Sequence, residues 1–208
     1  AESKKYYRKM YQFDPRNHRY RNLDTGRFVR YAEVLQFVDG EVKRLEVRLQ
    51  GHARLLNSGK INVGEFQLRF AESLKNSHLR MAALGAGGQQ QMTAQQLGHV
   101  GRELSTQYEY LYYFGYQIES GKVSEKRILQ RSKMYAKSIN TSFYHAEFTA
   151  RGKVGFYAKR LLDPQAQHCE SCIAYQQLNW VPINQIVPPG VRCICGGRCR
   201  CRVIARKI

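Results

Sequence analysis

The chain has 208 residues, 43% of them hydrophobic, which is enough for one sizeable domain or for one domain with a small appendage. Lysine and arginine together number 34 against 16 aspartates and glutamates, which gives a formal net charge of +18. There is no apolar run of membrane-spanning length, and no apolar segment follows the polar N-terminus, so we expect neither a membrane span nor a signal peptide.

The basic charge is confined to particular segments. Residues 1–30 carry nine basic and three acidic side chains, whereas residues 31–120 carry nine of each. Residues 121–160 carry ten basic and two acidic side chains, and residues 191–208 carry six basic and no acidic ones. This localisation favours contact with a polyanion, most commonly nucleic acid, over a basic surface that only aids solubility. Because no recognition-helix or RNP signature is present, DNA contact would be to phosphates.

Residues 1–30 are predicted to form an extended, basic N-terminal arm. Aromatic residues alternate with basic ones, and Asp14-Pro15 and Asp24-Thr25-Gly26 are turn signals without helical or strand periodicity between them. Such an arm needs a surface to lie on: a partner subunit, nucleic acid or the chain's own helical body. The arm residues expected to contact a polyanion are Lys4, Lys5, Arg8, Lys9, Arg16, Arg19 and Arg21.

Residues 31–160 are predicted to form a helical body. The first helix covers residues 33–58, and a second begins at Asn62 with Glu65 as its capping-box partner. The apolar face of the first helix comprises Val38, Val42, Leu45, Leu49 and Leu56, and that of the second comprises Phe66, Phe70, Leu74 and Met81. The glycine-rich segment 85–88 predicts a flexible joint.

The third predicted helix begins at Thr93, with Gln96 as the capping-box partner, and ends at Gly121. Its predicted core stripe comprises Leu97, Val100, Leu104, Tyr108, Leu111, Tyr112 and Ile118. Residues 108–116 are aromatic on almost every side, which indicates either the centre of a bundle or a subunit interface.

The next predicted helix begins after Ser124 and combines a buried stripe with a basic face. The inward-facing residues are Ile128, Tyr135, Ile139, Phe143 and Ala146. The basic face is the best polyanion candidate within the body and comprises Lys126, Arg127, Arg131, Lys133 and Lys137. A short helix from about Val154 to Leu162 is expected to lead into the C-terminal module.

All six cysteines lie in residues 161–208, in the order Cys-x2-Cys, a 20-residue excursion, and Cys-x-Cys-x3-Cys-x-Cys. A Cys-x2-Cys turn directs two thiolates to one point, and a second pair from a distal loop completes a tetrahedral zinc site. We expect Trp180, Ile183, Ile186 and Val187 to cover this site. One zinc is the simplest reading, and spacing alone does not choose among Cys193, Cys195, Cys199 and Cys201.

Two alternatives to zinc remain open. Three disulfides would suit a small secreted domain, but the other four-fifths of the chain is large, charged and free of cysteine. A redox Cys-x2-Cys normally opens a helix within a βαβ pattern, which is not visible here.

The C-terminal segment contains, in order, Lys159-Arg160-Leu161-Leu162-Asp163-Pro164, then His168-Cys169-Glu170-Ser171-Cys172, a proline-rich turn, and Cys199-Arg200-Cys201-Arg202-Val203. This order resembles the C-terminal motif of phage head morphogenesis proteins, the minor head proteins of the phage Mu type. The resemblance covers residues 159–203, about a fifth of the chain. On that match the zinc ligands are Cys169, Cys172, Cys199 and Cys201, with Cys193, Cys195 and His168 as alternates. Cys193 and Cys195 are additional to the usual pattern, and the sequence Gly196-Gly197-Arg198 stands where the family often has His-Pro.

The resemblance implies a virion protein that assembles with portal and capsid proteins near the portal, after synthesis in the host cytoplasm. It implies a structural role in head assembly, with contact to packaged DNA through the basic segments, Arg200 and Arg202 included. A homo-oligomer is expected within the assembly. The alternative reading is a cellular zinc-ribbon protein that binds nucleic acid.

The sequence does not predict an enzyme. His52, His78, His99 and His145 are each expected to be helix-face or core residues, and no paired carboxylates, nucleophile elbow or phosphate-binding loop is recognisable. A zinc ion with four cysteine ligands would also leave no open position for a catalytic water.

Overall fold

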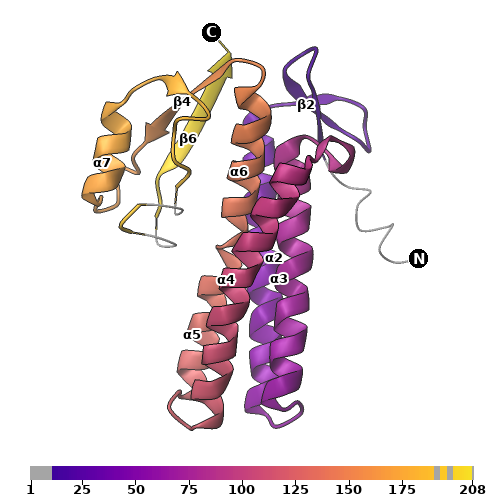
Figure 1. Ribbon diagram of the computed structural model, residues 1–208, viewed down its shortest axis with the longest axis vertical. Helices are drawn as coiled ribbons and strands as arrows, with labels where there is room; N and C mark the ends of the chain where they lie inside the picture. Colours follow the sequence, from indigo (N-terminus) through magenta and orange to yellow (C-terminus); the bar gives the residue numbers. More distant parts are fainter. Residues whose placement is uncertain (1–10, 190–192, 196–198, 208) are drawn as a thin grey trace.

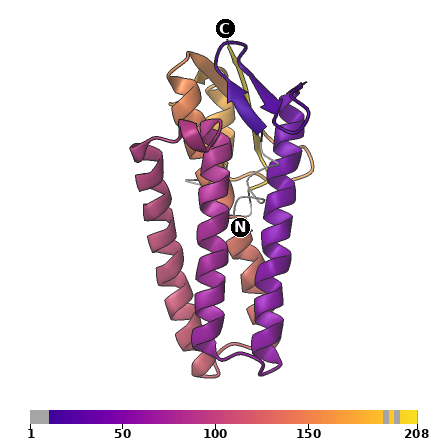
Figure 2. The same cartoon turned by 90° about the vertical axis from the view of Figure 1, so that its right-hand side faces the viewer.

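The computed structural model describes residues 11–189, 193–195 and 199–207, and it is mainly helical (Figure 1). The body is an elongated bundle in which α5 and α6 follow one another along a single column (Figures 1 and 2). Its helices are α2 (Tyr31–Asn57), α3 (Val63–Ala86), α4 (Ala94–Glu119), α5 (Glu125–Ala136) and α6 (Ile139–Gly152), with a short 3₁₀ turn, η1 (Gln89–Gln91), between α3 and α4.

The starts of α3 and α4 are fixed by the predicted capping boxes. The Asn62 side chain accepts from the backbone N–H of Glu65, and the Glu65 carboxylate accepts from the N–H of Asn62. Thr93 and Gln96 make the corresponding pair at α4. These contacts satisfy N–H groups that have no partner inside the helix.

The predicted apolar faces of the first two helices form the core of the bundle. Phe66, Phe70, Leu74 and Met81 of α3 are all buried, as are most of the predicted residues of α2. The predicted stripe of α4 is wrong at Leu97 and Tyr112, which are 47% and 68% exposed. Leu97 lies in the first turn of α4, and Tyr112 is turned by about 100° from its buried neighbour Leu111.

The break between helices that was expected at residues 85–88 is confined to residues 87 and 88. Gly85 and Ala86 are buried helical residues of α3, and the left-handed conformation begins at Gly87 (φ 101°). A Cβ atom at Gly85 would lie 2.2 Å from the carbonyl oxygen of Phe143. Glycine at this position therefore permits the close backbone approach of α3 and α6.

The predicted helix after Ser124 is divided in two at Lys137 and Ser138. All five inward-facing residues predicted for it are nevertheless buried. The α5 half packs on α2, whereas the α6 half packs on α3 and α4.

The described part of the predicted extended arm is a small antiparallel sheet, whose strand periodicity the sequence did not reveal. Strands β1 (Tyr11–Asp14), β2 (Arg19–Asn22) and β3 (Phe28–Val29) are neighbours in that order. The sheet covers one end of the bundle (Figure 1), where Phe13 and Tyr20 are buried. These residues therefore lie on the chain's own helical body, one of the three surfaces weighed for them above.

Residues 156–207 build a second sheet beside α6. Strand β4 (Phe156–Leu161) lies between β5 (Val181–Pro182) and β6 (Arg202–Lys207), antiparallel to both. The prediction of a helix from Val154 to Leu162 is therefore wrong. Strand pairing and alternate burial on β4, where Ala158 and Arg160 face inward, override the local preference.

The apolar residues expected to cover the metal cover this sheet instead. Ile183 and Ile186 pack with Phe148 of α6 and with Ala158 in a small core of their own. Trp180 lies 4.0 Å from the guanidinium carbon of Arg206 on β6, measured to the ring centroid. Because this core includes Phe148 of α6, it holds the sheet against the bundle.

Candidate metal centre

The cysteines reach one site from three segments. Cys169 is the N-cap of α7 (Glu170–Gln177), and Cys172 lies in its first turn. Cys199 and Cys201 immediately precede β6, while Cys193 and Cys195 come from the preceding loop. Because β6 pairs with β4, and α7 packs on β4, the two ends of this 33-residue stretch meet.

Four sulfur atoms, those of Cys172, Cys193, Cys195 and Cys199, all lie within 4.8 Å of one another. The Cys172 sulfur is 3.7 Å from the sulfurs of both Cys195 and Cys199, and the Cys195 and Cys193 sulfurs are 3.5 Å apart. A tetrahedral zinc ion with bonds of ~2.3 Å to sulfur has S···S edges of roughly 3.8 Å. The four sulfurs could therefore hold a metal ion without rearrangement.

All six cysteines lie in the described part of the chain, and none of them forms a disulfide in this structure. A disulfide requires a sulfur–sulfur distance of about 2.05 Å, well below the separations of 3.5–3.7 Å found here. The sulfur positions of Cys172, Cys193, Cys195 and Cys199 are those of a group that could hold a metal ion.

Only two of the four predicted zinc ligands belong to the group of four sulfurs that lie closest together. Cys172 and Cys199 belong to the close group, in which the alternates Cys193 and Cys195 take the other two places. Cys201 instead lies 3.8 Å from Nδ1 of the alternate ligand His168. The extra cysteines, which the family pattern lacks, were the sequence signal for this difference.

Cys169 also adjoins the cage. Its sulfur lies 3.3 Å from the Ser171 hydroxyl, and this hydrogen bond lowers the pKa of the Cys169 thiol to about 6. By contrast, burial raises the pKa of Cys172, with further increases from its contacts with neighbouring thiols. Metal binding must therefore displace a proton from the most buried ligand.

A buried cation stands beside the cage. Arg160 of β4 is fully buried, and its Nη2 donates to the carbonyl oxygen of Val187, while Nε and Nη1 have no hydrogen-bond partner. Burial raises the pKa of the Cys201 thiol, and the positive charge of Arg160 opposes part of that rise. A buried cation with unsatisfied donors is costly on its own, so its position suits a site that becomes negatively charged. Sequence reasoning did not assign Arg160 a role.

Those predicted polyanion-binding residues that the structure describes do not form one patch. Arg16, Arg19 and Arg21 belong to the sheet at one end of the bundle, whereas α5 lies toward the other end (Figure 1). On α5, Lys126 and Arg127 are exposed, as are Lys133 and Lys137. Lys4, Lys5, Arg8 and Lys9 lie outside the described residues.

Several of these basic side chains make intramolecular contacts. Arg21 lies over the Phe28 ring and 3.7 Å from Asp14, and Arg200 is 2.8 Å from Asp163. Arg131 of α5 lies 4.1 Å from the Phe114 ring centroid and donates to Gln117, and Lys133 pairs with Glu46 at 3.5 Å. Arg202 is exposed.

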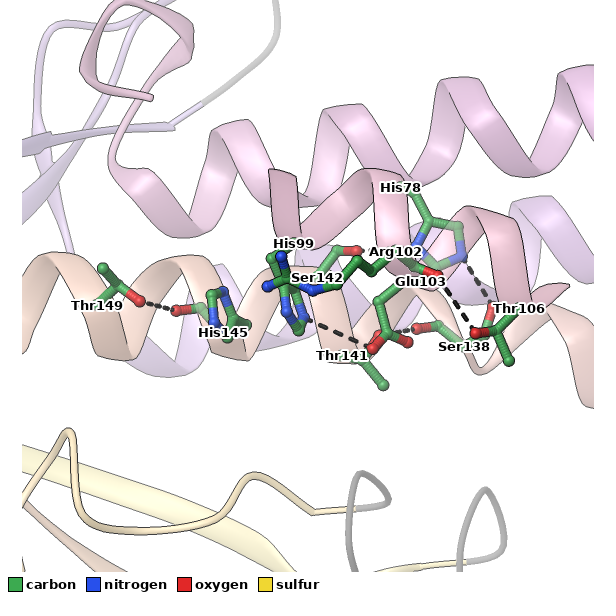
Figure 3. Close-up of polar contacts among 10 residues, drawn as sticks. All are labelled: His78, His99, Arg102, Glu103, Thr106, Ser138, Thr141, Ser142, His145 and Thr149. Carbon is green, nitrogen blue, oxygen red and sulfur yellow. Dashed lines mark hydrogen bonds and ion pairs between the residues drawn. The ribbon is translucent and has the colours of Figure 1, made fainter. Parts of the chain in front are cut away.

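Three histidines gather where α3, α4 and α6 meet, which sequence reasoning did not foresee (Figure 3). The rings of His99 and His145 are stacked, with centroids 3.4 Å apart and an interplanar angle of 7°. His78 is fully buried, with Nδ1 2.8 Å from the Ser142 hydroxyl and Nε2 3.0 Å from that of Ser138. Burial lowers the pKa of both His78 and His145 to about 4. Of the three, His78 lies in the core, whereas His99 and His145 are half-buried on the faces of their helices.

No family model, curated protein or solved structure matches the chain. Within the described part of the chain, no helix has the length and apolarity required to cross a bilayer.

Proposed function

We propose that this chain is a structural minor head protein of a tailed bacteriophage, associated with portal and capsid proteins and held together at its C-terminal end by zinc. The observation that carries the proposal is the order of residues from Lys159-Arg160 through Cys169 and Cys172 to Cys199-Arg200-Cys201, which resembles the minor head proteins. The cysteine cage supports a metal-stabilised module, because a small module with little apolar core needs a further source of stability, although only Cys172 and Cys199 of the motif ligands belong to the close group of four.

Zinc is the metal that best suits the cage. Zn²⁺ is a borderline-soft ion that binds both thiolates and imidazole, and sulfur separations near 3.7 Å suit tetrahedral coordination. Closed coordination by protein ligands gives a structural and not a catalytic ion, so we propose a non-enzymatic role.

The surface of α4 supplies area for a partner protein. Tyr112, Tyr113 and Tyr116 are each more than half exposed, as is Tyr110. Exposed tyrosines are common in protein interfaces, where they combine a large apolar ring with a polar tip. This surface supports the expectation of assembly with portal or capsid proteins, or with further copies of the chain in the virion.

The decisive experiment is co-expression of the chain with the portal and major capsid proteins of the same genome, followed by nuclease digestion and co-purification. Portal or capsid protein should remain bound after digestion. A Tyr112→Ser/Tyr116→Ser variant should lose that association, while a control Lys60→Ala variant, changed at an exposed position on the loop before α3, should retain it. Absence of both proteins from the purified fraction would contradict the proposal.

The second candidate function is nucleic-acid binding by a cellular zinc protein, and it is favoured by the exposed Lys126, Arg127 and Lys137 on α5. Binding through phosphates would weaken steeply with salt, and removal of each contacting cation would reduce the slope of log K against log salt by about 1. DNA binding with such a slope, combined with no portal or capsid association, would select this alternative. In the head-protein proposal the same side chains contact packaged DNA.

A further inference from the structure

The cysteine cage offers more ligands than one ion can use. One tetrahedral zinc takes four ligands, whereas six thiols and the imidazole of His168 meet in this part of the fold. From this surplus and from the central place of Cys172, we infer that the module binds two zinc ions that share the thiolate of Cys172. The inference rests on the zinc site proposed above and deepens it.

The first ion would occupy the close group of four sulfurs. The sulfurs of Cys172, Cys193, Cys195 and Cys199 have mutual separations within 4.8 Å, and three of these separations, of 3.5 to 3.7 Å, are near the tetrahedral value of roughly 3.8 Å. This group is complete in itself and uses none of the other three donors.

The second ion would occupy the remaining donors. Cys201 and His168 lie 3.8 Å apart, from Sγ to Nδ1, which is a separation that two ligands of one ion can have. Cys169 and Cys201 both interact with the Cys172 thiol, and Cys172 also contacts the first group. Cys172 is fully buried between the two sets and is therefore the sulfur placed to bridge them.

There is room for the second ion beside the first. A pocket of about 300 Å³ is lined by His168 and Cys201 together with Cys172, Cys195 and Cys199. The pocket thus lies on the side of the close group where His168 and Cys201 are found.

The number of donors agrees with two ions. Two four-coordinate ions need eight bonds, and seven donors supply eight when one thiolate bridges. Six thiolates around two divalent ions leave a net negative charge, and the buried guanidinium of Arg160 stands beside Cys201 to offset it. No ligand from outside the chain is required.

The test is native mass spectrometry of the full chain, first stripped with a strong chelator under reducing conditions and then refilled with zinc. The inference predicts two zinc ions per chain. A single zinc would overturn the inference and leave the proposed zinc site intact, whereas a chain that takes up no zinc would overturn both.

Ligand variants separate the two positions. His168→Asn should bind one zinc and keep the first position, and Cys193→Ser should weaken the first position while the second persists. A matched control, His52→Asn on α2, should still bind two. If His168→Asn bound as many ions as the unchanged chain, the second ligand set would be wrong.

Cadmium NMR tests the shared thiolate directly. Two cadmium resonances with scalar coupling between them would support a bridge, because only a common sulfur links the two ions through bonds. Two uncoupled resonances would overturn the bridge at Cys172, and a single resonance would overturn the second ion.

Discussion

The hydroxyl of Tyr31, at the start of α2, donates a 2.7 Å hydrogen bond to the buried carboxylate of Glu147 on α6. The Tyr20 hydroxyl of the N-terminal sheet lies 3.5 Å from the other oxygen of that carboxylate, and Arg151 lies 3.9 Å from it. The Arg151 guanidinium in turn rests on the Phe13 ring, 3.2 Å from its centroid. One buried acidic group therefore connects the sheet, α2 and α6.

Removal of the Tyr31 hydroxyl tests this connection. Burial raises the pKa of Glu147, and hydrogen bonds from the two tyrosines oppose that effect. Tyr31→Phe should lower the free energy of unfolding by about 1.5–3 kcal/mol, since a donor to a buried carboxylate is lost without a replacement. Urea denaturation measures the change. The exposed Tyr110→Phe is the control and should alter stability by less than ~0.5 kcal/mol; equal effects of the two variants would contradict the role of Glu147.

Gly85 tests the close contact of α3 with α6. A methyl group there would lie 2.2 Å from a backbone oxygen of α6, so the helices must separate to admit it. Gly85→Ala should destabilise the protein by about 1–3 kcal/mol or more, despite the better helix propensity of alanine.

Gly101→Ala on α4 is the matched control, because a Cβ there meets nothing within 4 Å. This change should stabilise the protein by roughly 0.5–1 kcal/mol through helix propensity alone. Thermal unfolding of both variants gives the comparison, and effects of the same sign would contradict the close approach.

The buried His78 predicts a loss of stability in mild acid. Burial lowers its pKa from 6.5 to about 4, with a smaller contribution from His99, so the unfolded chain binds a proton that the folded chain does not. Stability from this residue is fully present above pH ~6.5 and is lost as the pH falls from there toward 4, by roughly 3 kcal/mol in total.

The measurement is the free energy of unfolding as a function of pH for the unchanged chain and for His78→Gln. The difference between the two curves should shrink as the pH falls below 6.5, because glutamine does not titrate. His52→Gln is a less buried control and should leave more of the pH dependence in place. A difference that stays constant across this range would show that folding does not lower the pKa of His78.

Sequence patterns predicted the helices better than the strands, and the reason is local. Asn62 and Thr93 mark their helices with capping boxes that involve only residues three positions apart. By contrast, β4 depends on pairing with β6, some forty residues later, which no window around Phe156 contains. The N-terminal strands are equally short and owe their order to the burial of Phe13 and Tyr20 against the bundle.

The presence of a metal-binding module could be predicted from the sequence, but the identity of its clustered cysteines could not. Clustering of every cysteine near the C-terminus predicted a metal-binding module, and the structure brings four of them together. The spacing could not show which four, because Cys193 and Cys195 enter through the path of a long loop. Arg160 was hidden for a similar reason: a basic residue in a presumed helix gives no sign that β4 buries it beside Cys201.

Arg160 itself can be tested by substitution. Arg160→Gln removes the buried positive charge beside Cys201 and should weaken zinc binding by about tenfold or more, since the thiolates would lose a nearby counter-charge. Competition with a chromophoric chelator measures the affinity. Arg206→Gln, on the exposed side of β6, is the control and should keep the original affinity; equal losses would indicate general damage to the sheet.

Metal removal should unfold the C-terminal module and leave the helical body folded. The cysteine cage, the small core around Ile183 and the bundle core are separate clusters of buried residues, so loss of the metal deprives mainly the first of its stability. Trp180 is the single tryptophan and packs against Arg206 of β6, so its fluorescence reports on the module alone.

On addition of a strong chelator we expect the Trp180 emission to shift toward that of an exposed indole while the far-ultraviolet circular dichroism of the helices is largely retained. Simultaneous loss of both signals would show that the module and the bundle unfold as one cooperative unit, and an unchanged emission would show that the sheet does not depend on the metal.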